Sequence, residues 1–129
     1  NGIITINGEA EIQALENSGT VEVNGSSKIS TLKNISETSE VQFNQTGAVE
    51  ILENKGKVFV NENVSAKNVE NEGKITIAEG KIFAISGTLT DKNEIGGDGT
   101  IKINGTNNIP NSHVLPPVNG TIIFVVKSV

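Results

Sequence analysis

The stretch VFVNENVSAKNVENEGKITI, at residues 58–77, contains one complete repeat and the beginning of the next. Val58 and Val60 return as Ile75 and Ile77 seventeen residues later, and in each pair one residue lies between the two apolar ones. Alternation of this kind over three or four residues is typical of a half-buried β-strand. A fixed period near twenty residues, with one short structural unit in each period, indicates a solenoid.

The same spacing extends in both directions from this stretch. Each period carries two apolar positions in a first short segment and two more in a second segment, and Asn and Gly are frequent in the connections. Because stacked parallel strands place equivalent residues directly above one another, we expect four inward columns of apolar side chains. These columns are Ile4, Val21, Val41, Val58 and Ile75; Ile6, Val23, Phe43, Val60 and Ile77; Ile12, Ile29, Val49, Ala66 and Phe83; and Leu15, Leu32, Leu52 and Val69. When the repeats are aligned on these columns, the apolar pattern does not continue at Ser86 and Thr88.

Two steps along the chain are longer than seventeen residues. Three extra residues lie within residues 35–40, so the step into the third coil is twenty residues. The alignment places a sixth coil at Ile101, Ile103, Asn104 and Ile109, where Ile101 follows Ile75 by twenty-six residues. We therefore expect a loop insertion near residues 86–99, where Gly and Asp residues are concentrated.

The last twenty residues differ from the repeats. Pro residues at positions 110, 116 and 117 are incompatible with a regular coil, because Pro cannot donate a hydrogen bond to a neighbouring strand. Ile122 and Phe124 follow Ile101 and Ile103 by twenty-one residues and predict a terminal strand. This strand would form either a seventh coil or a cap.

Together these patterns predict an all-β fold, a right-handed parallel β-helix (β-solenoid) of about six or seven coils with a basic step of seventeen residues. Residues 1–109 are expected to form the coils, and residues 110–129 a proline-containing tail with a terminal strand or cap. Because the chain begins inside a repeat, without a capping segment, we expect the coils to continue into further coils of a longer chain.

Asn residues recur at two further positions of the repeat. An Asn at a turn tolerates a left-handed backbone, and its side-chain amide can bond to the amide stacked above it. We therefore predict a structural role for both columns, with a row of carbohydrate-binding amides as the alternative. The columns are Asn7, Asn24, Asn44, Asn61 and Asn104, and Asn17, Asn34, Asn54 and Asn71.

The composition narrows the classes of function. The net charge is −5 and the chain has ten basic residues, all of them Lys, which disfavours nucleic-acid binding because such binding relies on basic patches and Arg contacts. The chain has no Cys and a single His, His113, so no metal site is predicted. Asp91 and Asp98 could contribute to a cation site, but two carboxylates are too few for a calcium cage. No catalytic residue is predicted, because no nucleophile can be paired with a credible base. No cofactor or small-molecule substrate is predicted either.

The segments ENKGKVFVNENV, at residues 53–64, and VENEGKITIAEGKI, at residues 69–82, resemble passenger segments of bacterial autotransporter adhesins. The resemblance covers residues 2–109. It implies a long right-handed β-helix secreted to the bacterial cell surface, with a role in adhesion and virulence. It also implies a host-cell protein, another surface protein or a glycan as the partner, and it supplies no catalytic motif.

Two other classes fit the same repeat. Bactofilin-like proteins are small cytoplasmic β-helices of similar coil length that polymerise end to end, and some polysaccharide lyases and hydrolases are β-helices. The irregular steps and the long tail favour a surface passenger. Because binding residues concentrate on loops held by a rigid scaffold, we expect recognition at the segments that interrupt the period, which are residues 35–40, 86–99 and 110–120.

Overall fold

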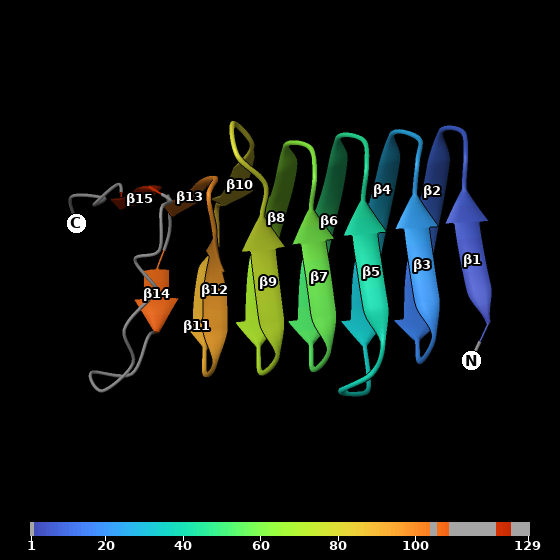
Figure 1. The fold of residues 1–129 in the computed structure, drawn as a ribbon, viewed down its shortest axis with the longest axis horizontal. Coiled ribbons are helices and arrows are strands. Elements are labelled where there is room, and N and C mark those ends of the chain that lie inside the picture. Colours follow the sequence, from blue (N-terminus) through green and yellow to red (C-terminus); the bar gives the residue numbers. More distant parts are fainter. Residues whose placement is uncertain (1, 104–105, 109–120, 125–129) are drawn as a thin grey trace.

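The computed structural model describes residues 2–103, 106–108 and 121–124, and in this part the chain winds into stacked coils of parallel strands (Figure 1). One sheet has the strand order β1-β3-β5-β7-β9-β12, and the other has the order β15-β13-β10-β8-β6-β4-β2, with β11 paired to β8 and β14. The strands are β1 (Ile3–Ile6), β2 (Ala10–Asn17), β3 (Thr20–Val23), β4 (Ser27–Asn34), β5 (Glu40–Phe43), β6 (Gly47–Asn54), β7 (Lys57–Val60), β8 (Val64–Asn71), β9 (Lys74–Ile77), β10 (Ile82–Ile85), β11 (Thr88–Asp91), β12 (Glu94–Gly97), β13 (Thr100–Ile103), β14 (Thr106–Asn108) and β15 (Thr121–Phe124).

The winding of the coils is right-handed. In Figure 1 the strands of the first sheet run upward at the front, the chain crosses at the top, and the strands of the second sheet run downward behind. Each coil then advances along the long axis, away from the N-terminus. The six strands of the first sheet mark six turns of the solenoid. The predicted fold class, a right-handed parallel β-helix, is confirmed.

The strand register confirms the predicted columns through the first four coils. Val23 pairs with Phe43, Phe43 with Val60, and Val60 with Ile77. These four side chains are at most 2% exposed. Ile6 pairs with Val23 and packs against the core from the first coil, where β1 has a neighbouring strand on one side among the described residues. Apolar burial along these columns is the main contribution to stability.

The long strands of the second sheet turn a corner halfway along. In β4 the buried residues are Ser27, Ile29, Leu32 and Asn34, so the two-residue alternation is interrupted once between Ile29 and Leu32. The pairing of β4 with β6 likewise omits Ser30. As a result, both halves of the strand direct side chains into the same narrow core.

The three extra residues of the third coil lie where the sequence predicts them. The turn from β4 to β5 contains residues 35–39, whereas the turn from β6 to β7 contains only Lys55 and Gly56. The side chain of Ser39 is buried, and its hydroxyl donates a hydrogen bond of 2.7 Å to the carbonyl of Ser36. The longer turn is therefore closed by its own hydrogen bonds.

Gly56 and Gly73 are required by close contact between successive turns. Neither has a positive φ. A Cβ at Gly73 would collide with the carbonyl oxygen of Gly56, and a Cβ at Gly56 would collide with the carbonyl oxygen of Ser39. Close approach of the backbone therefore explains the Gly residues at these turns.

The register of the fifth coil differs from the prediction. Phe83 pairs with Val64, and Ile85 is the residue that pairs with Ala66, so the assignment of Phe83 to the column of Ala66 is wrong. The shift arises because five residues separate Ile77 from Phe83, whereas three separate their register partners Val60 and Val64. Sequence alignment cannot detect this shift, since Phe83 and Ile85 are both apolar and either fits a core position.

The loop insertion expected near residues 86–99 is also wrong, because this stretch contains β11 and β12. Leu89 pairs with Val69, and Ile95 pairs with Ile75. The repeat therefore continues beyond Ser86, after a break between β10 and β11. At that break the N–H of Thr88 donates a hydrogen bond of 3.0 Å to Oδ1 of Asn68.

Consequently, Ile101 and Ile103 belong to a different column from the predicted one. They pair with Phe83 and Ile85 in the second sheet, not with the first-sheet residues Ile75 and Ile77. The first-sheet strand of this coil is β12, in which Gly97, with φ of 104°, occupies the position opposite Ile77. A Gly in place of an apolar residue conceals the strand pattern.

The terminal strand β15 pairs in parallel with β13, with Ile122 opposite Ile101 and Phe124 opposite Ile103. The predicted step of twenty-one residues is thus confirmed. Asn104, Ile109, His113 and the recognition segment at residues 110–120 lie outside the described residues. In the described part of the chain, no helix is long and apolar enough to cross a membrane.

Candidate functional site

The inner Asn column forms a buried ladder of side-chain amides. Each Nδ2 donates to Oδ1 of the Asn in the next coil, over 3.0 Å from Asn17 to Asn34 and 2.9 Å from Asn34 to Asn54 and from Asn54 to Asn71. Each of these side chains is at most 3% exposed. The amides of this ladder are enclosed and cannot contact an external ligand, which supports the structural interpretation of this column.

The ladder also closes the turns that lead back to the first sheet. Oδ1 of Asn54 accepts the N–H of Gly56 at 3.1 Å, while its Nδ2 donates to the carbonyls of Gly56 and Lys74, both at 3.1 Å. Asn71 makes the equivalent bonds with Gly73. Buried polar groups need hydrogen-bond partners. Each inner Asn supplies them to backbone N–H and C=O groups of its turn that would otherwise be unpaired.

The outer Asn column forms a second ladder at the opposite turns, and its amides donate in the reverse direction. Nδ2 of Asn24 donates to Asn7 over 3.3 Å, Asn44 to Asn24 over 2.9 Å, and Asn61 to Asn44 over 2.9 Å. Asn7 and Asn61 are exposed and Asn44 is half-buried. This ladder is therefore open to solvent along its length.

Asp91 continues the inner ladder into the fifth coil. It pairs with Asn71, is fully buried, and accepts 2.9 Å and 3.2 Å hydrogen bonds from Nδ2 of Asn71 and the N–H of Asn93. Asp98 is exposed in the turn from β12 to β13, so the two carboxylates considered for a cation lie in different turns. The described residues contain no group of three or more His, Cys, Asp or Glu side chains suited to holding a metal ion.

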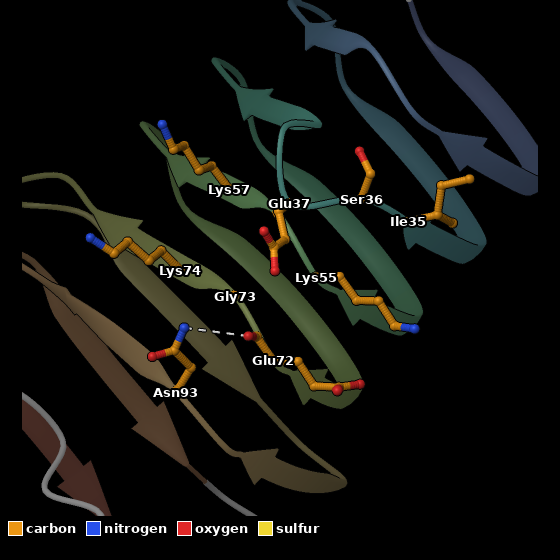
Figure 2. Close-up of a pocket in the computed structure, with 10 residues that line it drawn as sticks. Ile35, Ser36, Glu37, Lys55, Lys57, Glu72, Gly73, Lys74 and Asn93 are labelled. Atoms are coloured by element: carbon orange, nitrogen blue, oxygen red, sulfur yellow. Dashed lines mark hydrogen bonds between the residues drawn. The ribbon is translucent and has the colours of Figure 1, made fainter.

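A groove of about 530 Å³ lies along the turns that join the second sheet to the first (Figure 2). We call it the turn groove. One end is formed by the longer turn of the third coil, and the other by Asn93. Its lining residues are Ile35, Ser36, Glu37, Lys55, Gly56, Lys57, Glu72, Gly73, Lys74 and Asn93.

Charged side chains surround the turn groove. Lys57 and Lys74 are neighbours in the strand register and project in a common direction, whereas Lys55 and Glu72 project from the other side (Figure 2). In the described part of the chain, the one ion pair within 4.0 Å joins Lys81 and Glu62, which do not line the groove. The ammonium and carboxylate groups of the groove are therefore available to solvent or a ligand. The groove thus offers hydrogen-bond donors and acceptors around a floor of Gly backbone.

The turn groove unites parts of two segments predicted to carry recognition. Ile35, Ser36 and Glu37 come from the first segment, and Asn93 comes from the second. Asn93 reaches the turn of the preceding coil, where its Nδ2 donates a hydrogen bond of 3.3 Å to the carbonyl of Glu72. Lys57 and Lys74 also line the groove. Their place there follows from the turn geometry and carries no signal in the sequence.

The ion pair lies at the turns of the opposite side. The Lys81 ammonium is 3.0 Å from Oε1 of Glu62, and the hydrogen bond from Lys81 lowers the pKa of Glu62 below its ordinary value of 4.5. The N–H of Asn63 lowers this pKa further. A second groove of about 620 Å³ lies on this side, over the small residues Ala10, Ser27 and Gly47.

Comparison of this chain with protein families, with curated proteins and with solved structures finds no match.

Proposed function

We propose that this chain is a non-catalytic β-solenoid segment of a secreted bacterial surface protein, and that it acts as a stalk or adhesive passenger. The observation that carries this proposal is the position of the longest described turn between the sheets. The five residues 35–39 interrupt a series of two-residue turns and form one end of the turn groove. A regular scaffold with a longer, accessible turn is suited to the display of a binding site, because binding residues concentrate on loops held by a rigid scaffold.

The finer assignment follows the resemblance to autotransporter passengers. It places the protein outside the cell, with a host-cell protein, another surface protein or a glycan bound at the turn groove. The exposed side chains Ile35, Lys55 and Lys57 would supply the contacts, because they combine an apolar surface with donors for hydrogen bonds. The regular coils would act as a spacer that holds this groove away from the membrane.

The proposal is tested by shortening the irregular turn. Residues 35–39 are replaced by Lys-Gly, the sequence of the turn at Lys55 and Gly56. The fold should be retained because the carbonyl of Ser39 accepts from Asn34 as the carbonyl of Gly56 accepts from Asn54, so the introduced Gly can serve the same bond. The matched control is Glu50→Ala, which changes an exposed residue on a coil face away from the groove.

The assay compares binding of both variants and the wild type to whole host cells and to immobilised surface glycans. Binding should fall at least about ten-fold for the shortened turn, which corresponds to the loss of a single strong contact, and should be unchanged for Glu50→Ala. Equal binding by the shortened variant would rule out the turn groove as the contact surface. Protease accessibility on intact bacterial cells tests the location, and full protection inside the cell would favour the polymerising cytoplasmic class.

A further inference from the structure

Two Asn–Gly pairs occupy equivalent turns of the first two coils. Asn7–Gly8 follows β1, and Asn24–Gly25 follows β3. Asn is a thermolabile residue, and Gly leaves its own nitrogen unhindered because it has no side chain. In such a pair the backbone nitrogen of Gly can attack Cγ of Asn. The bond from Cγ to the side-chain nitrogen then breaks, ammonia leaves, and a five-membered succinimide forms, which water opens to aspartate or isoaspartate.

The outer ladder holds these two Asn side chains to different degrees. Oδ1 of Asn24 accepts from Asn44 over 2.9 Å, and Nδ2 of Asn24 donates to Asn7 over 3.3 Å, so this amide is bonded on both sides. Among the described residues, the Asn7 side chain takes part only in the longer of these two bonds. To reach the nitrogen of its own Gly, the side chain must leave the ladder, and Asn24 must break one more hydrogen bond than Asn7 to do so.

The packing of the two Gly residues also favours faster reaction at Asn7 than at Asn24. A Cβ at Gly25 would collide with the backbone of Gly8, whereas a Cβ at Gly8 would meet no atom within 4 Å. Gly25 is thus pressed against the preceding turn, and its backbone has little room for the rotation that attack requires. Gly8 has that room.

We propose that Asn7 is a site of spontaneous deamidation in the folded protein, and that the outer ladder protects Asn24 from the same reaction. The rates should differ by several-fold to about ten-fold, because one additional net hydrogen bond changes an equilibrium by that factor. Where the succinimide opens to aspartate, the carboxylate at position 7 can still accept from Asn24. The ladder therefore tolerates the aspartate product in the first coil.

The experiment follows deamidation of the purified chain at mildly alkaline pH by peptide mass spectrometry in ¹⁸O-labelled water, with isoaspartate measured separately. In the folded protein the pair at Asn7 should convert several-fold faster than the pair at Asn24. In concentrated urea the two rates should become similar, because the residues before the two pairs, Ile6 and Val23, are both β-branched.

Two variants test whether the ladder is the cause. Asn44→Ala removes the second bond to Asn24 and should raise the rate at Asn24 toward that at Asn7. Asn61→Ala removes the next amide of the ladder, leaves both bonds of Asn24 in place, and should not change its rate. Equal rates at the two pairs in the folded wild type, or an unchanged rate at Asn24 in Asn44→Ala, would overturn the proposal.

Discussion

Replacing Asn54 with Ala should destabilise the protein far more than the same change at Asn61. Both residues belong to Asn ladders in neighbouring turns, but Asn54 is 1% exposed whereas Asn61 is exposed to solvent. Two chemically identical substitutions therefore separate the energetic value of a buried amide ladder from that of an exposed one.

The cost at Asn54 can be worked out from its hydrogen bonds. The change removes the acceptor of the Gly56 N–H and leaves that buried donor without a partner, which costs about 1–3 kcal/mol. It also removes the bonds with Asn34 and Asn71, each worth about 1 kcal/mol net. Asn34 and Asn71 retain other partners, because Asn34 still donates to the carbonyl of Ser39 and Asn71 still accepts the N–H of Gly73. The sum is about 3–5 kcal/mol.

The corresponding change at Asn61 removes one bond, to Asn44, and water can replace it. We expect a loss of less than about 1 kcal/mol there. The free energies of unfolding are measured by urea denaturation monitored by circular dichroism, with similar m values required for the comparison. A loss below about 1 kcal/mol for Asn54→Ala, or equal losses for the two variants, would refute the view that the inner ladder stabilises the turns.

Three further predictions use the same measurement. Val60→Asp should cost several kcal/mol of unfolding free energy, on the order of the penalty for an unpaired buried charge, because Val60 is 0% exposed. The control, Thr76→Asp on the exposed outer face, should be nearly neutral. A loss below about 1 kcal/mol for Val60→Asp would show that the assigned face is wrong. Gly73→Ala should lower the midpoint of urea unfolding because its Cβ collides with backbone, while Gly8→Ala, in open space, should leave it unchanged; equal midpoints would contradict the close packing of the turns. The Glu62 carboxylate has a lowered pKa, so its ion pair should stabilise the fold at neutral pH and cease to do so as the pH falls through and below 4.5. The unfolding free energy of Glu62→Gln should accordingly depend less on pH in that range than the wild-type value, and identical pH profiles would exclude this contribution.

The first four coils were predictable because their signals are local and redundant. Asn17, Asn34, Asn54 and Asn71 recur with the apolar positions, and each repeat independently supports the same register. The extra residues at 35–39 were also predictable, because the pattern resumes unchanged on both sides of them. Because the repeats on both sides are intact, aligning both of them leaves one place for the extra residues.

The fifth and sixth coils were not predictable in the same way. Asp91 stands where the earlier coils have Asn, and Gly97 stands where they have an apolar residue, so two markers of the repeat are missing. Additional residues between β9 and β10 and between β10 and β11 also shift the register ahead of these markers. The choice of Ile85 over Phe83 as the partner of Ala66 rests on which alignment pairs the backbone and fills the core, and both alignments keep apolar residues inward.

The sequence alone determined the repeat, its period, the parallel stacking of the coils and the inward columns, because these follow from alternation within strands and from recurrence between them. The tertiary structure alone decided that Lys57 and Lys74 meet Glu37 and Asn93 around one groove, and that the inner amides are enclosed while the outer ones are open. The physical reason is that neighbours along the solenoid axis are set by the length and path of each turn. A difference of one or two residues in a turn changes which side chains meet, yet it leaves the apolar alternation of the strands intact.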